Sequence, residues 1–163
     1  DIFMGIGTAG FRQESDTAIY EMQIDNAMAL NEKLPPIKGI YYFSYACDAT
    51  ILADDGTRSL DPELGGGMYK VSGARLCTYE GVTPSGYVID EKWQANDGLV
   101  NTYSALVPIG APSVDYNADS VTTGIWNVMP VMRGNHSTLQ GGMTKALNGR
   151  IFFVDLLSMI NSL

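Results

Sequence analysis

The sequence contains one histidine and two cysteines, and these low counts exclude several kinds of metal site. Cys47 and Cys77 lie far apart and neither belongs to a Cys-x-x-Cys pair, so the ligands of a zinc finger are missing. Two cysteines can still form one disulfide bond. We favour two buried thiols, because free cysteine is commonly buried, while the disulfide stays open. The redox compartment is therefore undecided.

Positive charge and long apolar runs are scarce as well. Lys and Arg together number 10 against 18 Asp and Glu, and the net charge of −8 argues against a nucleic-acid partner. No apolar run approaches the ~18 residues that a membrane span requires, so no transmembrane segment is expected. The segment Asp1 to Gly7 lacks a basic region, a signal-peptide cleavage site and an initiator methionine. We expect that the native start was removed, or that the chain is a piece of something longer.

The remaining composition is that of a globular protein, and we find no repeat, linker or low-complexity tract, so one domain over residues 1–163 is the simplest organisation. A helix is expected after Asp16, whose side chain suits an N-cap, and a second helix over 26–34 ends at the following two prolines. Residues 39–46 are aromatic, β-branched and almost uncharged, which predicts a strand buried on both faces of a parallel sheet.

The second half of the chain is less regular. Residues 54–67 are rich in turn residues and predict a loop of about 20 residues, long enough to cover a site. Residues 69–88 fit a short helix or a strand equally well. A short strand over 124–131 leads toward His136, and apolar residues at helical spacing from about Asn148 predict a C-terminal helix docked on a core.

A serine nucleophile motif is also missing, because Gly-x-Ser-x-Gly does not occur. Two residues that could work with such a serine are present, Asp97 in an Asn-Asp-Gly turn and His136 in Gly-Asn-His-Ser. A histidine can take the proton of a serine hydroxyl, and a carboxylate can orient that histidine. Equally, the aspartate of an Asn-Asp-Gly turn often only caps the turn, and a lone loop histidine is commonly a solvated surface residue. Spacing alone leaves both interpretations open.

Several segments resemble secreted bacterial triacylglycerol lipases of the Bacillus–Staphylococcus type. Residues 16–22 are similar to the family's Asp-Thr-Ala-x-Tyr-Asp-Leu, and residues 41–46 to its Tyr-Tyr-Leu-Ser-Phe-Ala strand. Residues 93–102 are similar to its Trp-x-x-Asn-Asp-Gly-Ile-Val-Asn-Thr, and residues 124–127 to its Gly-Val-Trp-Asn. The resemblance implies an α/β fold, namely the C-terminal portion of an α/β-hydrolase with a partial, mostly parallel sheet and flanking helices. It also implies that Asp97 is the triad acid and His136 the triad base.

The resemblance further implies an extracellular lipase or carboxylester hydrolase that works through an acyl-serine intermediate on acylglycerols. The nucleophilic serine would lie upstream of this chain, which alone would be inactive. Because a sheet cut through its middle exposes an edge and an apolar face, we expect the chain to self-associate or to pair with the missing N-terminal half. The alternative is a non-catalytic binding or interaction module derived from the lipase fold.

Some family metal ligands are absent. Asn135 and Thr138 stand where the family has an Asp and a calcium-binding Glu, and Met143 lies near the position of a calcium-binding Asp. We therefore expect no calcium at this site, or much weaker binding, since calcium needs several oxygen ligands. Asp16 matches an aspartate that helps to bind structural zinc in some members, but its partner histidines are missing. Asp16 thus remains a possible zinc ligand whose primary role is capping, and no cofactor is predicted.

Overall fold

A parallel sheet carries the loops of interest. The computed structural model describes residues 18–141 and 148–163. Within them, β1 (Tyr42–Ser44) and β7 (Ser113–Asp115) pair in parallel with the two sides of β8 (Trp126–Val128). The chain continues from β1 into β2 (Cys47–Asp48) and from β8 into β9 (Met132–Arg133), and this second pair is also parallel. The segments that follow β2 and β9 therefore leave this pair at the same end, where the amide of Ala49 donates to the carbonyl of Asn96 at 2.8 Å.

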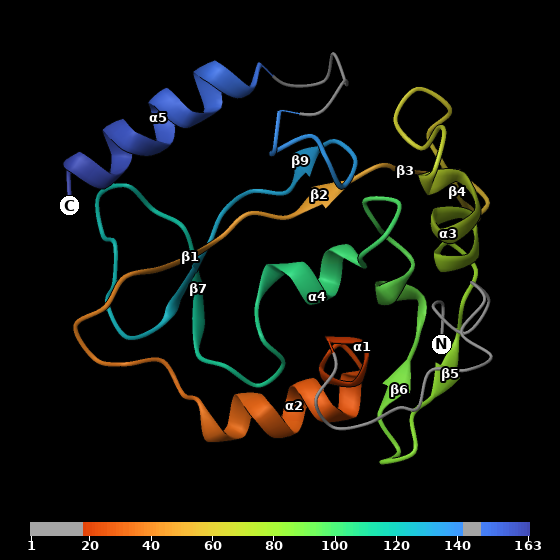
Figure 1. Cartoon of the computed structure of the whole chain (residues 1–163), viewed down its shortest axis with the longest axis horizontal. Coiled ribbons are helices and arrows are strands. Elements are labelled where there is room, and N and C mark those ends of the chain that lie inside the picture. The colour runs from red at the N-terminus through yellow and green to blue at the C-terminus, as the bar shows by residue number, and fades with distance from the viewer. Residues whose placement is uncertain (1–17, 142–147) are drawn as a thin grey trace.

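The other elements surround this sheet (Figure 1). The helices of the described residues are α1 (Ala18–Glu21), α2 (Ile24–Lys33), α3 (Tyr69–Leu76), α4 (Thr102–Leu106), α5 (Gly149–Asn161) and the 3₁₀ helix η2 (Glu91–Trp93). The antiparallel hairpins are β3 (Thr50–Leu52) with β4 (Arg58–Leu60), and β5 (Gly81–Val82) with β6 (Val88–Ile89). In Figure 1 both hairpins and α3 lie to the right, while α2 and α5 lie at opposite edges.

The predicted ends of two helices are confirmed. α2 stops at Lys33, two residues before Pro35, because proline lacks the amide donor of a helix and disfavours helical backbone before it. At the start of α5, the Asn148 side chain accepts hydrogen bonds from the amides of Arg150 (3.1 Å) and Ile151 (3.4 Å), as an N-cap does. The predicted cap at Asp16 lies outside the described residues.

Two predictions about the middle of the chain require correction. The loop expected over 54–67 contains β4, which pairs with β3, because the Asp55 carboxylate accepts hydrogen bonds from Thr57 and closes a hairpin turn at 53–57. The strand expected to be buried on both faces is shorter, and only Ser44 of β1 is buried. The undecided segment 69–88 contains both structures, α3 followed by the strand β5.

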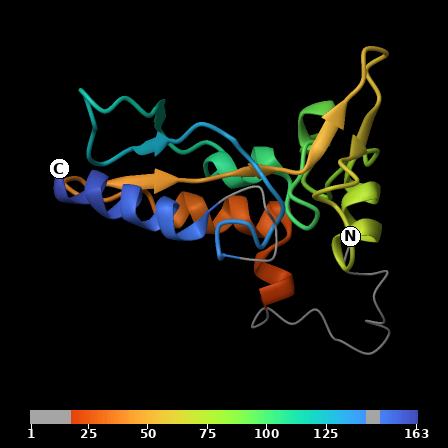
Figure 2. The ribbon, with the colours of Figure 1, turned by 90° about the horizontal axis from the view of Figure 1, so that it is seen from above.

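The C-terminal helix lies along one side of the β1–β2 path (Figure 2). Its inner residues Phe152, Leu156 and Met159 line a shallow apolar groove with Tyr45 and other residues of the sheet. No residue of α5 is buried, however, so the prediction of a helix docked on a core is wrong. The sheet covers only the strip of the helix formed by Phe152, Leu156 and Met159.

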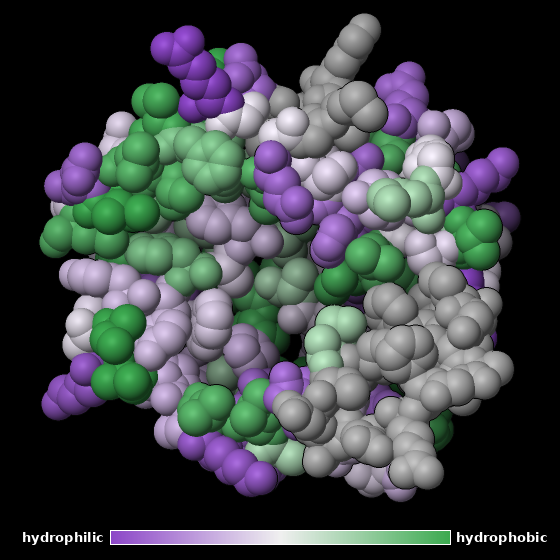
Figure 3. Space-filling model, viewed as in Figure 1, coloured by the Kyte–Doolittle hydropathy of each residue, from purple (hydrophilic) through white to green (hydrophobic). Residues whose placement is uncertain are grey.

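The outer face of α5 is correspondingly apolar and exposed. The exposed fraction is 57% at Ile151, 54% at Val154 and 59% at Leu157. Hydrophobic side chains gather over α5 at the upper left of the space-filling view (Figure 3). None of the helices in the described ranges has the length and apolar character needed to cross a bilayer.

The buried apolar residues gather instead around β2, α3 and η2. They are Ala46, Cys47, Ala49, Leu64, Leu76, Cys77, Ile89 and Trp93. Both cysteines are buried free thiols, as the sequence favoured. The best-packed part of the structure thus lies beside the end of the sheet from which the loops after β2 and β9 emerge.

Candidate active site

The Asn-Asp-Gly turn holds the carboxylate of Asp97 in a fixed orientation. Oδ1 of Asp97 accepts hydrogen bonds from the amides of Leu99 (2.9 Å) and Val100 (2.8 Å). The Asp97 amide donates to the carbonyl of Val100 at 3.0 Å, which closes the turn. Gly98 has a φ of +99°, a left-handed conformation that L side chains rarely adopt. Oδ2 of Asp97 is left to face the next loop.

Asn96 anchors this turn from below and is fully buried. Its amide nitrogen donates to the carbonyls of Gly73 (3.2 Å) and Gln94 (2.9 Å), while its Oδ1 accepts from the amide of Gly98 at 2.8 Å. Ser72 adds a hydrogen bond to the carbonyl of Gly98 at 2.5 Å. Sequence reasoning missed both anchors. The motif contains Asn96, but only the folded chain brings α3 beneath it.

His136 lies on the loop after β9 and meets Asp97 through two hydrogen bonds. Its Nδ1 lies 2.8 Å from Oδ2 of Asp97, and its amide donates to the Asp97 carbonyl at 2.8 Å. Two residues 39 positions apart in sequence are thereby brought into direct contact. The His136 side chain is 33% exposed against 13% for Asp97, so the ring reaches the surface and the carboxylate lies behind it.

This geometry defines the tautomer of the imidazole. When the imidazole is neutral and the carboxylate ionised, the carboxylate can only accept, so Nδ1 carries the proton and Nε2 keeps its lone pair. Nε2 has no hydrogen-bond partner among the described residues. The edge of the Tyr69 ring packs against the imidazole with centroids 6.2 Å apart. Nε2 can therefore accept a proton from a hydroxyl or a water that reaches the exposed side of the ring.

Cys47 does not supply a nucleophile for this pair. Burial, followed by the negative charges of Asp97 and Asp48, raises the pKa of the Cys47 thiol to about 11. A thiol with that pKa stays protonated at neutral pH, and the thiolate is the reactive form. Burial also raises the pKa of Cys77.

Asn135 and Thr138, the two positions near His136 where the sequence comparison expected acidic residues, carry neutral, hydrogen-bonded side chains. Asn135 donates from Nδ2 to the carbonyl of Leu64 at 2.8 Å, and Thr138 Oγ1 accepts from the Asn135 amide at 2.8 Å. Within residues 18–141 and 148–163 no group of three His, Cys, Asp or Glu side chains could hold a metal ion. Asp16 and Met143 lie outside these ranges, so the expectations for zinc and calcium stay predictions.

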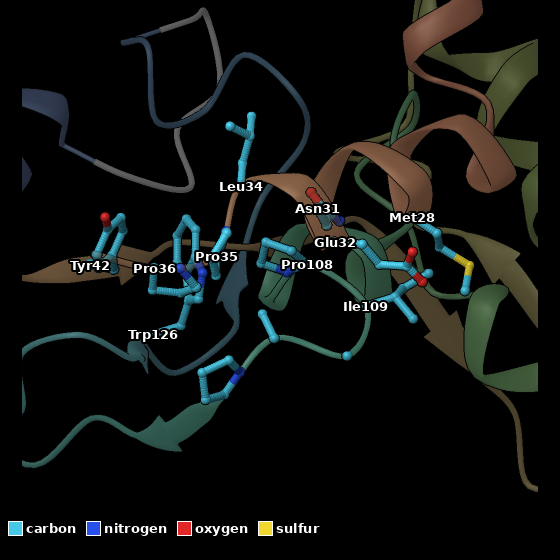
Figure 4. Close-up of a pocket in the computed structure, with 13 residues that line it drawn as sticks. Met28, Asn31, Glu32, Leu34, Pro35, Pro36, Tyr42, Pro108, Ile109 and Trp126 are labelled. Atoms are coloured by element: carbon cyan, nitrogen blue, oxygen red, sulfur yellow. The ribbon is translucent and has the colours of Figure 1, made fainter. Parts of the chain in front are cut away.

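A separate cavity of about 480 Å³ opens at the other end of the sheet (Figure 4). Its wall includes Tyr42 and Trp126, the first residues of β1 and β8, together with Met28 of α2 and the segment Pro108–Pro112. Because Asp97 and His136 lie beyond the carboxyl ends of β2 and β9, this cavity is no part of their site.

Known proteins resemble this chain in both sequence and structure. No protein-family profile matches it. A lipase from Staphylococcus hyicus is 30% identical over 151 residues, which are 91% of this chain and 22% of the relative. The resemblance to bacterial lipases is confirmed. The lipase-like chain thus spans only about a fifth of that relative's length.

Solved structures show the same partial match. The crystal structure of Staphylococcus hyicus lipase gives a TM-score of 0.72 at 25% identity and covers 91% of this lipase-like chain and 36% of the solved one. EstA from Clostridium botulinum gives a TM-score of 0.74 at 24% identity, and the match covers 91% of this chain and 37% of EstA. Lipase 1 from Pelosinus fermentans gives a TM-score of 0.64 at 27% identity, and the match covers 85% of this chain and 38% of that lipase. The predicted partial α/β-hydrolase fold, a parallel sheet with flanking helices, is confirmed.

Proposed function

We propose that this chain supplies the acid and the base of a catalytic triad to a secreted lipase or carboxylester hydrolase, as Asp97 and His136. The observation that carries the proposal is the 2.8 Å separation between Nδ1 of His136 and Oδ2 of Asp97. That contact, which leaves Nε2 without a hydrogen-bond partner among the described residues, is the arrangement that activates a serine hydroxyl. The similarity to lipases supports an ester as the substrate class, and acylglycerols as the natural members of that class.

The proposed reaction has two halves. In the first, Nε2 of His136 takes the proton of a serine hydroxyl as its oxygen attacks the ester carbonyl, and the same proton then passes to the leaving alcohol. In the second, Nε2 takes a proton from water as the water oxygen attacks the acyl-serine, and returns it to the serine as the fatty acid leaves. Asp97 holds the ring and stabilises its positive charge in both halves.

The serine belongs, in this proposal, to an upstream segment of the same protein. Gly-x-Ser-x-Gly is absent from the 163 residues, and no hydroxyl of the described residues bonds to Nε2 of His136. We therefore propose that residues 1–163 form the C-terminal half of a lipase-like domain, that this half is inactive by itself, and that its main partner is the other half.

The alternative, a non-catalytic module, was suggested by Asn135 and Thr138 in place of acidic residues. A module that had lost catalysis would have no need to keep a carboxylate within 2.8 Å of an imidazole. The paired geometry therefore favours the hydrolase.

The test compares the 163-residue chain with the longer protein encoded by the reading frame around it, using a p-nitrophenyl ester. We expect no turnover by the 163-residue chain. The longer protein should hydrolyse the ester, and His136→Ala should remove most of this activity without changing the circular dichroism spectrum. Turnover by the 163-residue chain that His136→Ala abolishes would reveal a nucleophile within it. Full activity of the longer His136→Ala protein would overturn the proposal.

A further inference from the structure

His136 sits inside a turn in which two polar side chains, those of Asn135 and Thr138, are buried. Asn135 is 6% exposed and Thr138 is 1% exposed, although both lie on a loop. Burying a polar side chain is unfavourable unless it is hydrogen-bonded, so these contacts have a structural consequence.

Thr138 closes the turn across His136. Its Oγ1 accepts the hydrogen bond of the Asn135 amide at 2.8 Å and lies 3.2 Å from Oδ1 of Asn135, to which it donates. The Thr138 amide donates to the Asn135 carbonyl at 2.9 Å. Oδ1 of Asn135 also accepts from the amide (3.1 Å) and the hydroxyl (3.0 Å) of Ser137. The Asn135 side chain, which precedes the histidine, thus bonds to the two residues that follow it, Ser137 and Thr138.

The closed turn is fixed to two other parts of the protein. Nδ2 of Asn135 donates to the carbonyl of Leu64, in the segment between β4 and α3, at 2.8 Å. The amide of Gly134 donates to the carbonyl of Asp48 in β2 at 3.1 Å. A Cβ on Gly134 would lie 2.8 Å from Thr138 side-chain atoms, so the packing there is tight. The His136 backbone therefore has little freedom to rotate.

We infer that Asn135 and Thr138 are positioning residues whose hydrogen bonds within the turn hold the His136 ring against Asp97. The contact between His136 and Asp97 uses both a ring nitrogen and a backbone amide, so it forms only when the 134–138 backbone takes this one conformation. The inference rests on the proposed function for its catalytic meaning, but the placement of the ring can be measured without any reaction.

The sole histidine makes the measurement direct. In the ¹⁵N-histidine-labelled 163-residue chain, the shifts of the two ring nitrogens report the tautomer of His136 at about pH 8.5, where an ordinary imidazole is neutral. We expect the Nδ1–H tautomer in the unmodified chain. Thr138→Val and Asn135→Asp should make the Nε2–H tautomer the major one, whereas Thr138→Ser, which keeps the hydroxyl, should retain Nδ1–H.

Asn127→Asp is the matched control for Asn135→Asp. Asn127 is fully buried in β8, and its Nδ2 likewise donates to backbone carbonyls, those of Tyr42 (3.1 Å) and Thr122 (2.8 Å). The same chemical change there should lower stability and leave the His136 tautomer unchanged. A loss of Nδ1–H in Asn127→Asp as large as in Asn135→Asp would mean that the effect is general destabilisation, and would overturn the inference.

The remaining outcomes are also decisive. A folded Thr138→Val chain that keeps the Nδ1–H tautomer overturns the positioning role and leaves the proposed function standing. If the longer protein has no esterase activity but the tautomer changes are as expected, the proposed function is overturned and the positioning role stands. If Thr138→Val does not fold, hydrogen exchange on the unmodified chain decides, because rapid exchange of the Asn135 and His136 amides would contradict a closed turn.

Discussion

His136 and Asp97 are joined twice, by the ring nitrogen Nδ1 to Oδ2 and by the His136 amide to the Asp97 carbonyl, each over 2.8 Å. The second contact means that the two loops, and not only the two side chains, are in register. A side-chain pair on flexible loops would gain little from a single exposed contact. Here the backbone contact also fixes the position of the His136 backbone relative to Asp97, so the ring has fewer orientations to lose when it bonds to the carboxylate.

Asp97→Asn in the longer protein should lower kcat for ester hydrolysis by about 10³- to 10⁴-fold, because an amide can present its NH₂ group to Nδ1 and favour the wrong tautomer. KM should change little, since Asp97 lies behind the ring. Steady-state kinetics with a p-nitrophenyl ester provide the measurement. Asp115→Asn, on the exposed strand β7, is the control and should retain full activity. Equal losses in both variants would show that the effect is not specific to the pair.

Gly98→Ala should destabilise the chain more than Gly56→Ala. Both glycines have a positive φ, +99° and +84°, which costs an alanine about 1–2 kcal/mol. Only at Gly98 would the new Cβ also meet another atom, Cβ of Tyr69 at 2.6 Å, and such overpacking adds about 1–3 kcal/mol. Urea unfolding of both variants measures the difference. Equal losses of stability would show that α3 can move away from the turn at no cost.

The Cys47 thiol should make stability fall at high pH. Its pKa is raised from 9.0 to about 11 in the folded chain, so the unfolded chain loses the proton more readily. The stabilisation is fully present below pH 9 and is lost as the pH rises through about 11. The difference in unfolding free energy between the unmodified chain and Cys47→Ala should therefore change in favour of the variant between pH 9 and about 11. Taking this difference removes the contribution of the tyrosines, which both chains share. A constant difference across this range would contradict the raised pKa.

The exposed face of α5 should drive association of the 163-residue chain. Ile151, Val154 and Leu157 are each more than half exposed on one helix, and large apolar patches on soluble proteins mark interaction sites. Sedimentation velocity should detect dimers or larger species, and Leu157→Glu should reduce them. Ser59→Glu adds the same charge at an exposed position of β4, on the other side of the molecule from α5 (Figure 1), and should have no effect. A monomer at all concentrations would refute the prediction.

Calcium should not stabilise the turn around His136. Asn135 and Thr138 are neutral, and their oxygens already take part in hydrogen bonds within the turn, whereas calcium requires several oxygen ligands and favours carboxylates. We expect the melting temperature of the 163-residue chain to be the same in millimolar calcium and in EDTA. A rise of several degrees with calcium would place an ion site within the chain and contradict this expectation.

Local signals predicted the elements that depend on neighbouring residues. The two prolines end the helix that precedes them, and apolar residues at helical spacing from about Asn148 mark the start of α5, so both ends were correctly predicted. The short strand predicted over 124–131 is present as β8, but only over Trp126–Val128. The β3–β4 hairpin was missed because its turn residues are also typical of an irregular loop. The exposure of α5 was missed because an apolar sequence does not reveal how much surface is available to cover it.

By itself, the sequence determined the types of group that this protein can use: one imidazole, one aspartate on a tight turn, and no serine in a nucleophile motif. The tertiary structure decided which of them meet. Parallel pairing of β2 with β9 brings the loop of His136 to the turn of Asp97, and the buried Asn96 and Thr138 side chains hold the two loops from inside. Such contacts join distant residues, and their free energy comes from burial and hydrogen bonds that exist only once the chain has folded.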